Sequence, residues 1–102
     1  MIQHLESHLA HLAATNQTTH YGALARDLGL SGPATIARLT MALEVLMEQD
    51  AAAGHPLRAA LVTARNSALP APGFFQKAAA LGFDITDPAA FIAAQRTALY
   101  VR

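Results

Sequence analysis

Three histidines near the start of the chain have a spacing that could bind a metal ion. His4, His8 and His11 are four and three residues apart, so on a helix they lie along one face. Two imidazoles one turn apart can bind a metal, but zinc sites usually take three or four ligands. No carboxylate on that face completes such a set. We therefore expect an exposed or interface-lining row of histidines, with no metal site and no cofactor.

Residues that could catalyse a reaction are few. The chain contains no cysteine, which excludes disulfides, thiol chemistry and cysteinyl zinc sites. It also has no nucleophile elbow, phosphate-binding glycine loop or metal triad. His55 lies between Gly54 and Pro56, as a loop histidine would, and Asp87 precedes Pro88 in the position of a helix cap. The sequence predicts no catalytic residue, and we expect the protein not to be an enzyme.

Charge is distributed unevenly along a chain whose formal net charge is zero. Residues 1–50 carry two arginines and five carboxylates, a net charge of −3, whereas residues 51–102 carry five basic and two acidic residues, a net charge of +3. No carboxylate occurs between residues 51 and 83. Zero net charge argues against strong nonspecific binding of polyanions. If the protein binds phosphate, we expect the second half to do so.

The residues around Gly29 have the pattern of a helix-turn-helix. Ala25 is small enough for a second helix to cross there, and Gly29 can adopt the positive φ that ends the first helix. Ser31 or Gly32 can cap the second helix, and Pro33 suits its first position. Compared with commoner helix-turn-helix patterns, this turn is one residue longer.

The second helix of this unit is amphipathic. Its inward face carries apolar residues at helical spacing: Ile36, Leu39, Leu43, Leu46 and Met47. Thr35 and Arg38 lie near its N-terminal end, the usual docking end of a recognition helix, and we expect them to contact a DNA groove. Met41 and Val45 lie on the outer face, where they would pack on another part of the domain or on a second subunit. Contact of Met41 with DNA is the alternative.

A short strand followed by a basic loop is predicted next. Leu57 to Thr63 has the pattern of a strand, and a stretch rich in turn formers follows it. After a helix-turn-helix, this is where the wing of a winged helix falls. Arg58 and Arg65 flank the strand, and Asn66 and Ser67 can donate hydrogen bonds to phosphate oxygens. An ordinary surface connection stiffened by prolines is the alternative.

The length of the chain, residues 1–102, suits one domain with one core. We predict a mostly α fold with a small β-hairpin, a winged-helix-like helix-turn-helix domain with an additional helix at each end. The helix-turn-helix core covers about residues 20–50 and the wing about residues 56–73, between helices at about 2–14 and 88–101. No apolar run approaches the roughly 20 residues that span a bilayer. We expect no membrane contact, no signal peptide and a cytoplasmic location.

Several motifs follow the order of a known family. They are Tyr21-Gly22-x-Leu24-Ala25, Gly29, an alanine-rich second helix, Pro56-x-x-x-x-Leu61-Val62 and Gly73-Phe74-x-x-Lys77. In this order they resemble the winged-helix domain of the alkylguanine DNA alkyltransferases and alkyltransferase-like proteins, over about residues 19–82. The family's Pro-Cys-His-Arg signature is absent, and without cysteine alkyl transfer is excluded. The resemblance implies a winged-helix fold and non-catalytic DNA binding.

Two functions follow from these patterns. The first is a non-catalytic winged-helix protein that binds double-stranded DNA or has a regulatory role, with Arg38, Arg58 and Arg65 converging on one positive face. The alternative is a protein-interaction or homodimerisation module with a helix-turn-helix core that does not bind DNA. Zero net charge and the outward Met41 and Val45 favour this alternative, and an isologous dimer is its simplest form.

Overall fold

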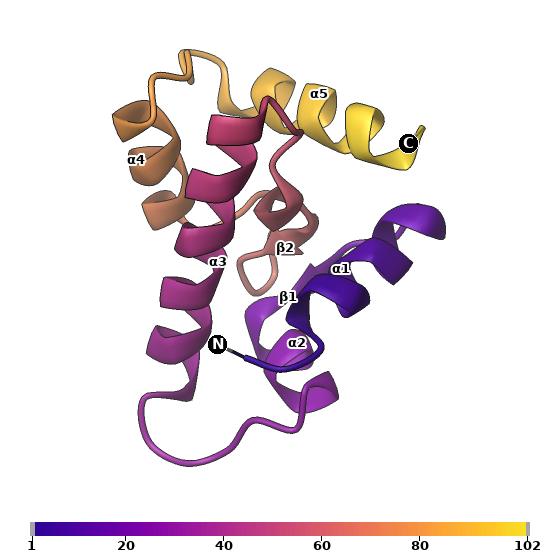
Figure 1. The fold of residues 1–102 in the computed structure, drawn as a ribbon. Coiled ribbons are helices and arrows are strands. Elements are labelled where there is room, and N and C mark those ends of the chain that lie inside the picture. Colours follow the sequence, from indigo (N-terminus) through magenta and orange to yellow (C-terminus); the bar gives the residue numbers. More distant parts are fainter. Residues whose placement is uncertain (1, 102) are drawn as a thin grey trace.

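The computed structural model describes residues 2–101, which form five α-helices, one 3-10 helix and two short strands (Figure 1). In chain order these elements are α1 (Leu5–Ala14), β1 (Thr19–His20), α2 (Tyr21–Asp27), α3 (Thr35–Ala53), η1 (Arg58–Leu61), β2 (Val62–Thr63), α4 (Pro72–Ala80) and α5 (Pro88–Tyr100). Figure 1 shows α3 on the left beside α4, and α1 on the right. The 3-10 helix lies between them and contacts α1, α3 and α5.

The core consists mainly of leucine side chains from the helices, which pack around the 3-10 helix η1. Its largest fully buried side chains are Leu5, Leu9, Leu24, Leu39, Leu46, Met47, Leu57, Leu61, Val62 and Ile92. The predicted inward face of the long helix is largely confirmed, but Ile36 is 47% exposed. It lies in the first turn of α3, where it borders an open depression beside α2.

The predicted fold class is confirmed, because the described chain is mostly helical with a small two-stranded sheet. The strands are parallel, with Thr19 paired to Val62 and His20 to Thr63. The sheet therefore differs from the expected hairpin, since α2, α3 and η1 separate its strands in the chain. Its effect is to fasten the start of α2 to the end of η1.

The strand expected from Leu57 is mostly not a strand. Residues Arg58–Leu61 form the 3-10 helix, and only Val62 and Thr63 pair as β2. Ala59, Ala60 and Leu61 are all buried, because helices cover this segment on several sides. Alanine is a poor strand former, and a fully buried apolar run carries no alternation that would distinguish a strand from a tight helix.

The connection between α2 and α3 is longer than a tight turn. Gly29 has the expected positive φ of 71°, and its N–H donates to the carbonyl of Arg26. Helix α3 begins at Thr35 and not at Pro33, which corrects the expected start. The reason is Ala34, whose φ of 61° is left-handed and interrupts the helix before Thr35. Neither Ser31 nor Gly32 caps α3, since its cap residue has no side-chain hydrogen bond.

Candidate nucleic-acid interface

The three arginines expected to converge on one face are not brought together. Arg58 lines a depression with residues of α1 and α5. Arg38 lines another with Met41 and Val45 on α3, and Arg65 lines a third beside α2. Each of the three thus lines a different depression, and these depressions give no support to one surface formed by all three. They were grouped from their order in the chain, whereas the direction of each side chain depends on how its element packs.

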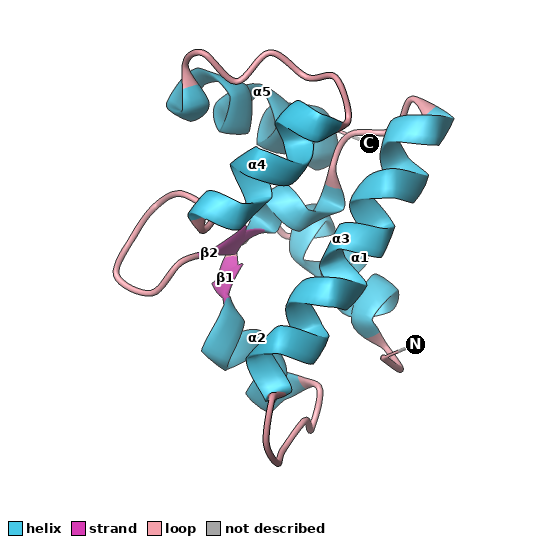
Figure 2. Ribbon diagram, turned by 90° about the vertical axis from the view of Figure 1, so that its left-hand side faces the viewer, coloured by secondary structure: helices cyan, strands magenta, loops and turns pink. Residues whose placement is uncertain are grey.

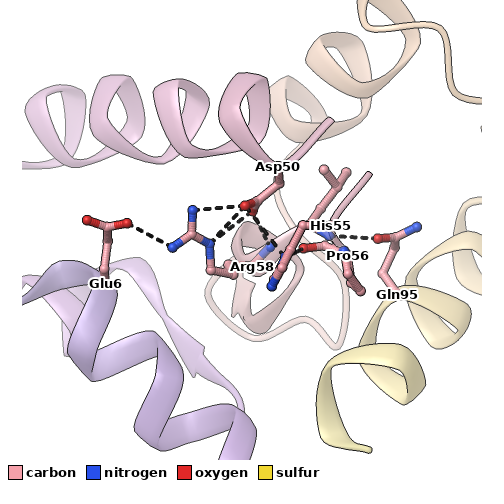
Figure 3. A network of polar contacts seen from close by, with 7 residues as sticks. Glu6, Asp50, His55, Pro56, Arg58 and Gln95 are labelled. Carbon is pink, nitrogen blue, oxygen red and sulfur yellow. Dashed lines mark hydrogen bonds and ion pairs between the residues drawn. The ribbon is translucent and has the colours of Figure 1, made fainter. Parts of the chain in front are cut away.

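Arg58 is held in an ion-pair network (Figure 3). Its Nη2 lies 2.8 Å from Oδ1 of Asp50, and its Nη1 donates to Oε1 of Glu6 at 2.9 Å. The backbone N–H of Arg58 also donates to Oδ2 of Asp50, at 3.0 Å. Burial opposes the charge of the guanidinium, but its bonds with Asp50 and Glu6 outweigh this and raise the pKa of Arg58. These contacts give Arg58 a structural role, and we leave it out of the candidate interface.

Thr35 and Arg38 both contact the connection that precedes α3. The hydroxyl of Thr35 donates to the carbonyl of Gly32 at 2.6 Å. Nη2 of Arg38 donates to the carbonyl of Ser31 at 3.0 Å. Both side chains therefore hold the connection against the first turns of α3, in place of the side-chain cap that the helix lacks.

The loop between β2 and α4 projects from the body of the protein (Figure 2). The N–H of Ala64 donates to the carbonyl of Leu69 at 2.9 Å, and the N–H of Ser67 donates to the carbonyl of Ala64 at 3.1 Å. These bonds close the base of the loop and leave Arg65, Asn66 and Ser67 exposed at its tip. We call residues 64–69 the basic loop.

A depression of about 720 Å³ separates the basic loop from α2 and the first turn of α3. It is lined by His20, Tyr21, Gly22, Arg26, Ile36, Ala64 and Arg65. Three of these side chains are basic or can become so, and none is a carboxylate. We call this surface the basic depression. It has the charge and the exposed apolar edge that suit a nucleic-acid backbone and its neighbouring groove.

His20 and Arg26 were not predicted as site residues. The pairing of His20 with Thr63 brings the start of α2 close to Arg65, and no local pattern in the sequence reveals that pairing. Nδ1 of His20 accepts a hydrogen bond from the N–H of Ala23 at 3.2 Å, so His20 caps α2. The proton of a neutral His20 is then on Nε2, which remains a donor.

Tyr21 lines the basic depression and also a smaller one that includes Glu44 of α3. Burial raises the pKa of its phenol, a hydrogen bond with the backbone of Ala71 lowers it, and the charge of Glu44 raises it. The hydroxyl therefore lies near Ala71 and Glu44, and we assign it no contact with an anion in the basic depression.

The histidine row of α1 does not form a cluster of ligands. Nε2 of His8 lies 3.7 Å from Oδ2 of Asp27, which ties α1 to the end of α2. Among residues 2–101, no group of three histidine or acidic side chains could hold a metal ion.

Comparison with family models, curated proteins and solved structures found no match. Within residues 2–101, no helix combines the length and hydropathy needed to cross a bilayer.

Proposed function

We propose that this protein is a non-catalytic, winged-helix-like protein that binds double-stranded DNA through the basic depression. The observation that carries the proposal is the grouping of His20, Arg26 and Arg65 around one depression without a carboxylate. The winged-helix architecture, the likeness to alkyltransferase-like proteins and a cytoplasmic location belong to the same proposal.

The elements around the basic depression have the roles that DNA binding requires. The first turn of α3, with Thr35 and Ile36, stands at its edge and supplies the end of a recognition helix. Arg65, Asn66 and Ser67 at the tip of the basic loop supply donors for phosphate oxygens, as a wing does. Contacts of this kind fix the position of a protein on the duplex but do not read its sequence.

The charge of α3 limits how DNA can approach. Glu44 lies at the middle of the helix, and Glu48 and Asp50 lie in its second half, so all three are away from Thr35. DNA would therefore meet the N-terminal end of α3, where the helix dipole is also positive. Because the net charge of the chain is zero, we expect weak binding with a clear salt dependence.

A fluorescence anisotropy titration with a short double-stranded DNA, at about 50 and 200 mM salt, tests the proposal. We expect binding that weakens as salt rises, because phosphate contacts release counterions. Replacing both Arg26 and Arg65 by alanine should reduce the salt slope by about two, one for each lost phosphate contact.

Lys77→Ala is the matched control, because it removes one positive charge from α4, outside the basic depression. It should leave the salt slope unchanged. Absence of binding at the lower salt concentration, or equal loss in the control, would overturn the proposal.

A further inference from the structure

The outer face of α3 carries a stripe with the spacing of a coiled-coil seam. Met41 and Val45 on this face are 69% and 41% exposed. With Arg38 and Glu48 they follow one another at intervals of three, four and three residues. This is the spacing at which two helices pack along a common seam. We call these four residues the seam.

The surface beside the seam is hollowed where a partner's side chain would enter. A depression of about 390 Å³ is lined by Ile2, Arg38, Met41, Ala42 and Val45. Its four α3 residues stand at positions i, i+3, i+4 and i+7, which is the arrangement of a hole in knobs-into-holes packing. A hole of this kind on an exposed helix fits a side chain of modest size from a second helix.

We propose that a second copy of this chain packs its α3 antiparallel on the seam, forming an isologous dimer. A two-fold axis on the outer face of α3, at the level of Leu43 along the helix, sets Met41 of each copy against Val45 of the other. The same axis places Val45 of the second copy over the hole lined by Arg38, Met41 and Ala42. Each copy thus supplies both the knob and the hole, as two-fold symmetry requires.

The charges at the ends of the seam select the antiparallel direction. The same two-fold axis brings Arg38 of one copy to Glu48 of the other. A parallel pair would instead set Arg38 against Arg38 and Glu48 against Glu48, and like charges repel. Glu48 is 53% exposed and already bonded to Lys77 of its own chain through Oε2, so a second cation would extend that pair into a short network.

The dimer and the proposed DNA binding use different surfaces. Of the residues that line the basic depression, only Ile36 belongs to α3, and it is not a seam residue. The dimer therefore does not depend on DNA binding, and it can be tested without DNA. An interface based on one helix pair is small, below about 1,200 Å², and we expect a dissociation constant on the order of micromolar.

Sedimentation velocity over a concentration series, from about 1 to 200 µM, tests the dimer around that expected affinity. The unmodified chain should shift from monomer to dimer as concentration rises.

Val45→Glu should weaken association at least about tenfold, because it places a carboxylate in the apolar hole. Val101→Glu is the matched control, since Val101 is 79% exposed at the end of α5, and it should associate as the unmodified chain does. Met41→Asp provides a second seam variant if Val45→Glu does not fold.

Charge reversal tests the antiparallel direction. Arg38→Glu alone and Glu48→Arg alone should each weaken the dimer, because each sets like charges against one another across the interface. The combined variant should recover most of the lost association, while circular dichroism reports that the fold is kept in all three. A monomer at every concentration, or a combined variant no stronger than the single ones, would overturn the proposal.

Discussion

At the scale of residues, Asp50 is the one charged residue among residues 2–101 that is buried. Its side chain is only 4% exposed, and it binds the guanidinium and backbone N–H of Arg58 while lying 3.6 Å from Nδ1 of His55. Figure 3 shows how these groups join the end of α3 to η1. A buried charge without a partner is costly, so Asp50 makes Arg58 necessary to the fold.

Replacing Arg58 by alanine should lower the free energy of unfolding by about 3–5 kcal/mol, because Asp50 stays buried without its cation. Glu6→Ala removes the other carboxylate, but its side chain is 55% exposed and its ion pair is screened by water. Glu6→Ala should therefore lower the free energy of unfolding by no more than about 1 kcal/mol. Urea unfolding followed by circular dichroism measures both. Similar losses for the two variants would contradict this account of Asp50.

At the scale of elements, the connection between α2 and α3 contains three residues with a positive φ, which are Gly29, Gly32 and Ala34. Gly29 has a φ of 71°, which glycine adopts without strain. Ala34 has a φ of 61°, in which its Cβ crowds the backbone. The hydrogen bonds from Thr35 and Arg38 to the connection offset this strain and hold the start of α3.

Ala34→Gly should raise the free energy of unfolding by about 0.5–1 kcal/mol, because glycine relieves the strained φ but is more flexible in the unfolded chain. Gly29→Ala should lower it by about 1 kcal/mol, although no atom would obstruct the added methyl group. Thermal unfolding of both variants provides the measurement. Destabilisation by Ala34→Gly would show that the left-handed start of α3 is not strained.

At the scale of the whole molecule, η1 is the segment around which the other elements are arranged. It contacts α1, α3 and α5, and Ala60 within it is fully buried. The carbonyl of Ala60 accepts a hydrogen bond from Nε of Arg96 on α5, at 2.9 Å. Just before η1, Leu57 donates its N–H to Oε1 of Gln95, which is also on α5, at 2.8 Å. Small residues here let three helices approach one another closely.

Ala60→Leu should lower the free energy of unfolding by about 1–3 kcal/mol, because the packed centre has no room for the larger side chain. Ala89→Leu makes the same change at an exposed position of α5 and should be close to neutral. Denaturant unfolding of the two variants gives the comparison. Equal stability of both would show that η1 is not the packed centre of the fold.

The sequence by itself determined the elements whose signals are local. Leu39, Leu43 and Leu46 recur at helical spacing and are buried, and Asp87 with Pro88 begins α5 as expected. Gly29 ends α2 with the positive φ that its residue type allows. Such signals depend only on neighbouring residues, so they can be interpreted without the fold.

Only the tertiary structure decided which distant residues meet. The parallel pairing of His20 with Thr63 joined α2 to the basic loop, and the buried carboxylate of Asp50 bound Arg58 in an ion pair. Both depend on contacts between segments far apart in the chain. Residue types alone do not show which residues of two such segments pair, and a charge does not show which way its side chain points. For the same reason, the exposure of Met41 and Val45 became a defined surface only once the neighbours of α3 were in place.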